Sequence, residues 1–294
     1  MDSVDSTNRH ALAELAAGRA GHLDAWRAVR QTAGRGRRGA RWESQPGDSL
    51  TMSVVVRGAW PWPGALSLVA GLAVLDAARA VAGGDVPLAV DWPNDVVWRA
   101  ATVPSGGPGA PLVEAPKVAG ILIEGRLGAP DPAAAADAAY VVGIGVNVRG
   151  ALGPALRAER PVATLAELGL DTTPEALGAA LHAALAERIA PLATAAKDGP
   201  AFDTAARTVC SAYLAAAGLA LGAPARVAVH GGGEGPSSGP GPEAAGEAPA
   251  RTLHEGVLRA FGPAGLTLEP TNGTSPGALR HVPLEHVAGL APVY

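Results

Sequence analysis

Apolar residues recur along this chain with two different periods, and the change between them predicts a fold of helices and strands. Apolar residues at helical spacing occupy the stretch between Asn8 and Gly18 and segments 63–82, 172–192 and 202–217. Short strand-like apolar runs occupy 25–30, 50–57, 88–98, 117–124 and 140–148. Ser6, Thr7 and Asn8 all suit the N-cap of the first helix, but only one of them can fill that position.

Beyond about residue 221 the pattern changes, and short strands replace the long helices. We expect these strands at 225–230, 252–261, 265–269 and 279–283. Residues 231–250 consist almost wholly of Gly, Pro, Ala, Glu and Ser, so they have little to bury and we expect a disordered insertion. Residues 99–116 are expected to form a surface insertion. We therefore predict an α+β domain of residues 1–220, followed by a small β-barrel of residues 221–294.

Two of the predicted strands contain residues that weaken a sheet. Proline is confined to strand ends, edges and bulges, so Pro93 indicates that Asn94 and Asp95 project from a strand end. Gly143 and Gly145 interrupt the strand at 140–148. Because glycine inside a strand often marks the close approach of a ligand or another backbone, we expect something to lie on this strand.

Composition argues against several classes of protein. A formal net charge of -4 in 294 residues argues against general nucleic-acid binding. Cys210 is the only cysteine, so no internal disulfide can form, and we interpret it as a buried thiol in a helix. The N-terminus lacks the regions of a signal peptide, and no apolar run approaches the length of a membrane span. We therefore expect a cytoplasmic protein.

Residues 31–42, the arginine–glycine segment, hold four arginines and three glycines and no acidic residue. Arginine forks are preferred partners of phosphate and carboxylate oxygens, and glycines let main-chain N–H groups approach such a ligand. The spacing of Gly34, Gly36 and Gly39 also matches the dinucleotide fingerprint, but that motif opens a helix and needs an acid about twenty residues later. Here a turn and a strand follow, so we reject it. An anion-binding loop remains, with a plain basic surface loop as the alternative.

Five motifs follow one another in a fixed order along the chain. They are Ser6-Thr7-Asn8, the arginine–glycine segment from Gln31 to Trp42, Trp92-Pro93-Asn94-Asp95, Lys117-x-x-Gly120-Ile121-Leu122-x-Glu124 and Gly143-Ile144-Gly145-Val146-Asn147. Each is moderately specific alone, but in this order they closely resemble the biotin protein ligases over nearly the whole chain from Ser6. The sequence resembles the single-function type, which lacks the N-terminal DNA-binding winged helix.

The resemblance implies both a fold and a reaction. The fold would be a mixed sheet with helices, like that of class II tRNA synthetases, followed by a small SH3-like β-barrel. The reaction would use ATP and Mg²⁺ to convert biotin to biotinyl-5′-AMP and would then transfer biotin to one lysine of a carrier. That carrier would be a biotin carboxyl carrier protein or domain of an acyl-CoA carboxylase. No DNA or membrane partner is implied, and a homodimer stays open.

The resemblance also assigns roles to individual residues. Those implied at the biotin site are Ser6, Thr7, Asn8, Gln31, Arg35, Gly36, Arg37, Lys117, Gly120 and Gly145. Those implied on the nucleotide side are Arg37, Arg38, Trp42, Asn94, Lys117 and Asn147, with Asp95 as a metal ligand. Lys117 and Arg37 are the implied catalytic residues. Two positions depart from the family pattern, since Ala40 stands where arginine is common and Asp91 where a basic residue is common.

The chemistry of adenylation agrees with these residue types. A carboxylate and an α-phosphate must approach each other, so cations are needed to offset their repulsion, and no covalent nucleophile is required. Two alternatives stay open. A lipoate- or octanoate-type ligase would share the fold, but the arginine–glycine segment argues against it. A non-catalytic biotin sensor predicts loss of Lys117 or of the arginines, and all of these are present.

Overall fold

The computed structural model describes residues 1–44, 46–58, 60–99, 115–126, 138–153, 161–230, 251–271 and 279–292. The chain divides into two compact units, Met1–Ala217 and Gly218–Tyr294. Of the two insertions expected from composition, 231–250 lies outside the described residues and 99–116 lies almost wholly outside them. The expected combination of a sheet with helices packed on it is confirmed.

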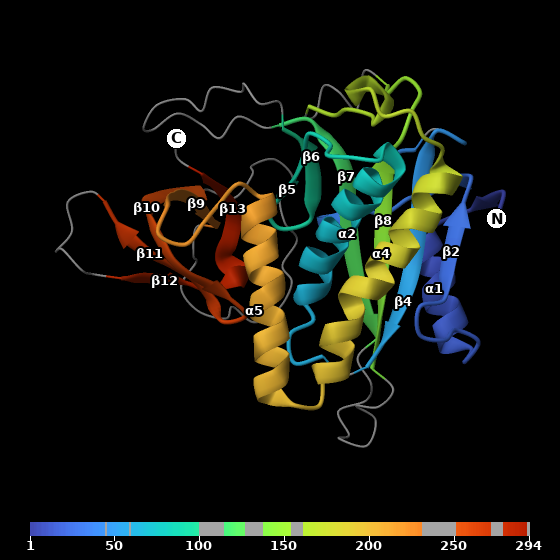
Figure 1. The fold of residues 1–294 in the computed structure, drawn as a ribbon. Helices are drawn as coiled ribbons and strands as arrows, with labels where there is room; N and C mark the ends of the chain where they lie inside the picture. The colour runs from blue at the N-terminus through green and yellow to red at the C-terminus, as the bar shows by residue number, and fades with distance from the viewer. Residues whose placement is uncertain are drawn as a thin grey trace, which may run out of the picture. The chain divides into compact units, whose positions relative to one another are not determined.

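The first unit is built on one antiparallel sheet of six strands in the order β2-β4-β8-β7-β6-β5 (Figure 1). The strands are β2 (Ala25–Ala28), β4 (Ser49–Arg57), β8 (Ala139–Asn147), β7 (Lys117–Arg126), β6 (Asp95–Trp98) and β5 (Leu88–Asp91). A separate parallel pair joins β1 (Ser3–Val4) to β3 (Arg30–Gln31). This pair brings Gln31 close to the start of the first helix.

The two faces of the sheet carry different helices, because successive side chains of a strand point to opposite faces. On one face, Val55 of β4 and Val141 of β8 belong to a core cluster with residues of α1 (Thr7–Ala16). On the other face, Leu50 lies against Gly178 of α4 (Pro174–Ala195). Helices α2 (Ala65–Ala82) and α5 (Gly199–Ala216) lie alongside α4 (Figure 1). The odd positions of β4 and β8 therefore share a face with α1.

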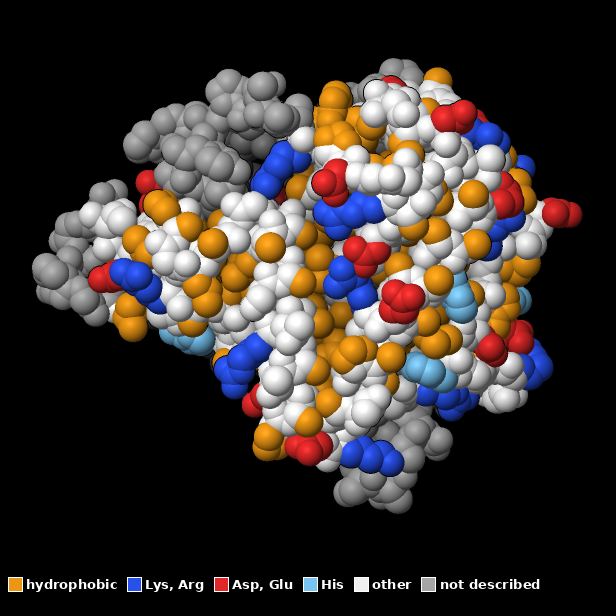
Figure 2. All heavy atoms as spheres, viewed as in Figure 1, with side chains coloured by type: hydrophobic (Ala, Val, Ile, Leu, Met, Phe, Trp, Pro, Cys, Tyr) orange, Lys and Arg blue, Asp and Glu red, His pale blue; other side chains and the backbone are white. Residues whose placement is uncertain are grey.

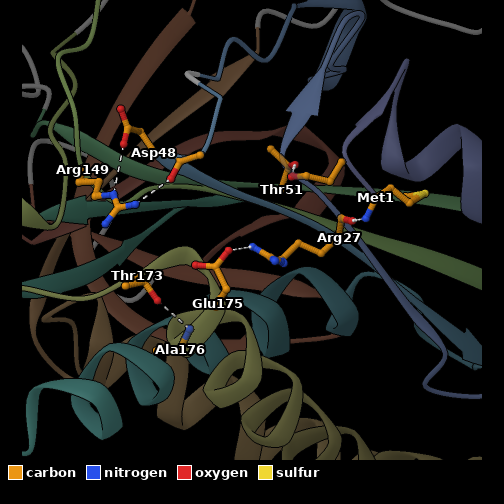
Figure 3. Close-up of polar contacts among 10 residues, drawn as sticks. Met1, Arg27, Asp48, Thr51, Arg149, Thr173, Glu175 and Ala176 are labelled. Atoms are coloured by element: carbon orange, nitrogen blue, oxygen red, sulfur yellow. Dashed lines mark hydrogen bonds and ion pairs between the residues drawn. The ribbon is translucent and has the colours of Figure 1, made fainter.

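Helix α4 starts at a side-chain cap and is tied to the edge of the sheet by an ion pair. The hydroxyl of Thr173 accepts a hydrogen bond from the backbone N–H of Ala176 at 3.2 Å, which satisfies one free donor of the first turn. Arg27 of β2 donates to Glu175, with 2.6 Å between guanidinium nitrogen and carboxylate oxygen. Figure 3 shows both contacts at the start of the helix.

Helix α2 is long and apolar enough to cross a membrane by length and composition alone, contrary to the expectation that no such run exists. However, 67% of its apolar stretch is buried, as in the core helix of a folded domain. Its polar side joins the neighbouring helix, because Asp76 forms an ion pair with Arg188 of α4. Figure 2 shows acidic and basic side chains next to one another on the face that carries these helices.

Three other features bear on the sequence-based expectations. The run 88–98 is a hairpin rather than one interrupted strand, because β5 and β6 pair antiparallel around a turn that contains the cis peptide bond Trp92–Pro93. Ser6 occupies the N-cap of α1, but its side chain makes no capping hydrogen bond. Cys210 is buried in α5 as expected, and burial raises the pKa of its thiol to about 12.

The second unit contains a five-stranded antiparallel sheet in the order β12-β11-β10-β9-β13. Its strands are β9 (Pro224–His230), β10 (Arg251–Gly262), β11 (Gly265–Pro270), β12 (Arg280–Val282) and β13 (Val287–Pro292). The apolar pattern does not predict β13, whose composition is rich in Ala, Gly and Pro; pairing with β9 gives it strand structure. Val227, Leu258 and Leu266 are buried in this unit.

Replacement of residues 231–250 by a two-residue turn is expected to leave the second unit folded. His230 and Arg251 are paired directly across β9 and β10, so these strand ends are as close as a tight hairpin requires. Each halving of loop length lowers the closure entropy cost by about 0.6 kcal/mol, so the change should be neutral or stabilising by up to ~2 kcal/mol. Thermal unfolding of both proteins measures this, and a lower melting temperature in the shortened protein would contradict it.

Candidate functional site

The arginine–glycine segment folds back on itself as a short hairpin. The backbone N–H of Trp42 donates to the carbonyl of Gly34 at 3.1 Å, and Arg35 and Arg41 form an antiparallel bridge. The tip of the hairpin turns at Gly39, whose φ of +78° lies in the left-handed region that favours glycine. The segment therefore presents its arginine side chains from a compact loop.

Arg35 and Arg37 contact neighbouring parts of the first unit. Arg35 pairs with Glu124 of β7 at 2.8 Å, and Arg37 donates to the side-chain oxygen of Asn94 at 2.8 Å. Asn94 is held in turn, because its amide nitrogen donates to the carbonyl of Ile121 at 3.0 Å. These contacts connect the loop to β7 and to the β5–β6 turn.

Burial and neighbouring charges shift the pKa of Arg37. Although the side chain is exposed, desolvation of its guanidinium lowers the pKa of Arg37, and the nearby Arg38 lowers it further. Asp95 acts in the opposite direction. An arginine pKa lies so far above neutrality that Arg37 stays a cation and can meet an anionic ligand.

The indole ring of Trp42 lies over glycines of two adjacent strands. A Cβ at Gly145 of β8 would stand 2.3 Å from the ring, and one at Gly120 of β7 would stand 3.0 Å from it. The ammonium nitrogen of Lys117 lies 5.5 Å from the ring centroid, within the range of a cation–π contact. The side chain of Trp42 thus makes the close approach that was expected at Gly145.

Lys117 is held at the start of β7 by a partly buried ion pair. Its Nζ lies 2.7 Å from Asp95 Oδ1, and the two side chains are only 17% and 11% exposed. Tyr213 of α5 is buried nearby, and desolvation raises the pKa of its hydroxyl well above the usual value, with smaller contributions from Asp91 and Asp95. The lysine is therefore fixed in position beside the loop arginines.

Thr7 and Asn8, at the start of α1, are buried and enter a polar network on the same face of the sheet. Gln31 Oε1 accepts from the backbone N–H of Thr7 at 2.8 Å and lies 3.1 Å from its hydroxyl. Ser53 of β4 lies 2.8 Å from the Thr7 hydroxyl and 2.6 Å from Asn8 Oδ1. Asn8 Nδ2 donates to Glu124 at 2.8 Å. Glu124 thus connects this network to the loop.

A cavity of about 240 Å³ opens beside the loop. It is lined by Gln31, Arg41, Trp42, Glu43, Ser44, Leu152 and Gly153. Among the described residues, Trp42 Nε1 and Ser44 Oγ are buried without a hydrogen-bond partner. Because an unpaired buried donor is costly, the cavity is suited to a ligand that carries hydrogen-bond acceptors.

The structure brings most of the candidate residues to one face of the sheet but leaves some at its margin. Asn147 follows Gly145 on the same face of β8 and donates to the carbonyl of Ala163 at 3.3 Å. Ser6 is buried at the start of α1, and Arg38 lies exposed at the loop tip. Ser53 is a site residue that sequence reasoning missed, because a serine in an apolar strand gives no signal.

Two further residues on this face also lie outside the assigned roles. Glu124 ends the Lys117 motif, and Gly143 precedes Gly145 in the last motif, but neither receives a role from the resemblance. A Cβ at Gly143 would stand 2.2 Å from Asn8 Oδ1, so this glycine gives room for the Asn8 amide. A glycine inside a strand was the signal in the sequence that could have identified this position.

Asp95 is the candidate carboxylate for the magnesium ion that the resemblance implies. Over the described part of the chain, no group of three His, Cys, Asp or Glu side chains is placed to hold a metal ion. Asp91 is the cross-strand partner of Asp95, so two carboxylates share this hairpin. Since Mg²⁺ that accompanies nucleotide phosphates needs only one or two protein carboxylates, these residues fit a metal delivered with a nucleotide.

Comparisons with known proteins agree with one another. The model of the biotin/lipoate A/B protein ligase family matches residues 1–147. A biotin–[acetyl-CoA-carboxylase] ligase from Paracoccus denitrificans is 41% identical over 167 residues, which cover 55% of this chain and 58% of that protein. The ligase of the same name from Mycobacterium tuberculosis is 37% identical over 150 residues, covering 49% and 46%. The chain therefore spans about half the length of these two relatives.

The fold also matches a solved structure. Biotin protein ligase from Aquifex aeolicus, in complex with biotin and ATP, matches with a TM-score of 0.62 and 22% sequence identity. The match covers 100% of this chain and 97% of that one. At this identity the match shows a shared fold alone.

Proposed function

Because the chain belongs to the biotin/lipoate A/B protein ligase family, whose model matches residues 1–147, we propose that it is a biotin protein ligase. In the first step a carboxylate oxygen of biotin attacks the α-phosphorus of ATP, and pyrophosphate leaves. In the second step the amine of a carrier lysine attacks the acyl carbon of biotinyl-5′-AMP, and AMP leaves while the amine loses a proton. The carrier is a biotin carboxyl carrier protein or domain of an acyl-CoA carboxylase.

One observation carries this proposal: cations and a buried polar network meet on the same face of the sheet. Lys117 lies at the start of β7, and Arg37 of the arginine–glycine segment contacts Asn94 in the β5–β6 turn. There the two cations can offset the charge of a carboxylate beside a phosphate. Thr7 lies at the start of α1 and Gln31 of β3 is bonded to it, so that both can bond a polar ring. The two groups suit the two ends of biotin.

The roles of individual residues follow from this division. Biotin is bound by Ser6, Thr7, Asn8, Gln31, Arg35, Gly36, Arg37, Lys117, Gly120 and Gly145, and the nucleotide by Arg37, Arg38, Trp42, Asn94, Lys117 and Asn147. Lys117 and Arg37 stabilise the charge that develops during adenylation. Asp95 would hold the Mg²⁺ that accompanies ATP, and the ion would supply positive charge to the phosphates. Asn8 contributes through its neighbours, since its amide is already bonded to Ser53 and Glu124.

The finer features of the fold belong to the same proposal. The first unit corresponds to a biotin- and ATP-binding domain of class II tRNA-synthetase-like fold over residues 1–220. Residues 221–294 correspond to an SH3-like barrel, which the five-stranded antiparallel sheet supports. We place the reaction in the cytoplasm, without a DNA or membrane partner. The choice between monomer and homodimer enters no step of the reaction.

The test is biotin-dependent exchange of labelled pyrophosphate into ATP, followed by transfer to a carrier domain. Purified protein with Mg-ATP is expected to exchange pyrophosphate only when biotin is present, and to attach biotin to one carrier lysine. Exchange without transfer would support the adenylation of biotin and contradict its transfer to a carrier. Tight biotin binding with no exchange would identify a non-catalytic sensor and overturn the proposal.

A further inference from the structure

A chain of hydrogen bonds runs through the first unit from Gln31 to Glu124. Its members in order are Gln31, Thr7, Ser53, Asn8 and Glu124. Gln31 accepts from the backbone N–H of Thr7 and the other members are linked through side chains, with every donor–acceptor distance 2.8 Å or less. Ser53 is fully buried, and Thr7 and Asn8 are each only 4% exposed. Such a buried chain has few ways to distribute its protons, because every donor must find an acceptor.

Glu124 fixes the orientation of Asn8 at one end of the chain. An ionised carboxylate can only accept, so the group of Asn8 that lies 2.8 Å from Glu124 must be its amide nitrogen. The same nitrogen lies 3.4 Å from the carbonyl of Leu122, which is also an acceptor. The side-chain oxygen of Asn8 must therefore face Ser53. Gly143 makes this position accessible, since a Cβ there would stand 2.2 Å from that oxygen.

The direction of the remaining hydrogen bonds follows from the proton count. Asn8 Oδ1 can only accept, so the single hydroxyl proton of Ser53 is donated to it. Ser53 then has only lone pairs for Thr7 at 2.8 Å. Gln31 Oε1 lies farther from the Thr7 hydroxyl, at 3.1 Å, so the hydroxyl proton of Thr7 goes to Ser53. Gln31 Oε1 is already satisfied by the backbone N–H of Thr7. The hydroxyl proton of Thr7 is thus committed to the protein.

We propose that Glu124 and Ser53 are positioning residues that make Thr7 a hydrogen-bond acceptor toward a ring N–H of the substrate acid. This inference rests on the proposed function and adds to it the residues that orient the group facing the ring. We call the chain Glu124–Asn8–Ser53–Thr7 the relay. With its proton turned inward, Thr7 Oγ1 can only accept from a bound ligand. Since Gln31 Oε1 is used by Thr7, the free donors of Gln31 are on its amide nitrogen. An acceptor next to a donor matches the N–H and C=O of a cyclic urea.

The test compares two acids in two variants. Ser53→Ala removes the link between Thr7 and Asn8, and Glu124→Gln permits either proton direction. In both variants we expect the dissociation constant for biotin, measured by calorimetry, to rise ~10-fold, the scale for one lost hydrogen bond. The kcat for pyrophosphate exchange with saturating biotin should stay within ~3-fold, because the ring is remote from the reacting carboxylate. In Ser53→Ala, exchange supported by octanoate, which has no ring N–H, should keep its kcat/KM within ~3-fold. Glu124→Gln also loses the ion pair with Arg35, so in that variant the loss should be smaller for octanoate than for biotin.

A matched control is available on the same strand. Thr51 is buried two residues before Ser53, but its hydroxyl donates to the carbonyl of Ala28 at 2.9 Å and takes no part in the chain. Thr51→Val should therefore leave the dissociation constant for biotin unchanged. Thermal unfolding of every variant checks the fold, and Glu124→Gln carries the test if Ser53→Ala does not fold.

Each outcome separates the relay from the enzyme assignment. A larger loss for biotin than for octanoate would support the relay. Equal losses for both acids would show a structural defect and overturn it, as would wild-type affinity for biotin in both variants. A wild-type protein that binds no biotin would overturn the proposed function together with the relay.

Discussion

Replacement of Lys117 by alanine is expected to lower the rate of adenylate formation by at least ~10²-fold, the scale for loss of one transition-state stabiliser. Lys117 is the cation held most firmly at the site, because its ammonium group is paired with Asp95 at 2.7 Å and is mostly buried. A preorganised charge costs no rearrangement when the carboxylate meets the phosphate. The loss should therefore appear in kcat for biotin-dependent pyrophosphate exchange.

The chain offers a direct control for this experiment. Lys197 is the only other lysine and lies exposed between α4 and α5, so Lys197→Ala should exchange pyrophosphate at the wild-type rate. Removal of Lys117 also breaks its partly buried ion pair with Asp95, so thermal unfolding must accompany the kinetics. A folded Lys117→Ala protein with wild-type kcat would remove this lysine from the mechanism.

The motifs with short internal spacing were predictable from the sequence. Asn94 and Asp95 project at a strand end as the proline indicates, although that end is a hairpin turn. The glycines of β8 did mark a close approach, as expected for glycine in a strand. What the sequence could not say is which group fills the space, and the structure places Trp42 over Gly145 and Asn8 over Gly143.

The relay could not be predicted because it depends on strand register and on which face carries α1. Ser53 lies 45 residues from Asn8, and Asn8 lies 116 residues from Glu124. Ser53 and Gly143 meet only because β4 and β8 pair in the observed register, and a shift of one strand by one residue would turn its residue to the opposite face. A serine in an apolar strand gives no local sign of such partners, whereas the buried network makes its role visible.

Wild-type protein is expected to activate biotin ~10⁴-fold more efficiently than lipoate or octanoate, measured as kcat/KM in pyrophosphate exchange. A site that bonds a polar ring rejects an analogue without that ring by a factor of this size, because its buried polar groups are left unpaired. Lipoate presents a dithiolane to Thr7 and Gln31 and cannot satisfy either, while its carboxylate can still reach Lys117. The penalty should therefore fall on binding of the ring, and saturating lipoate should recover part of the rate. A ratio near one would mean that the network does not read the ring, and a preference for lipoate would keep the fold and the adenylation chemistry but change the substrate.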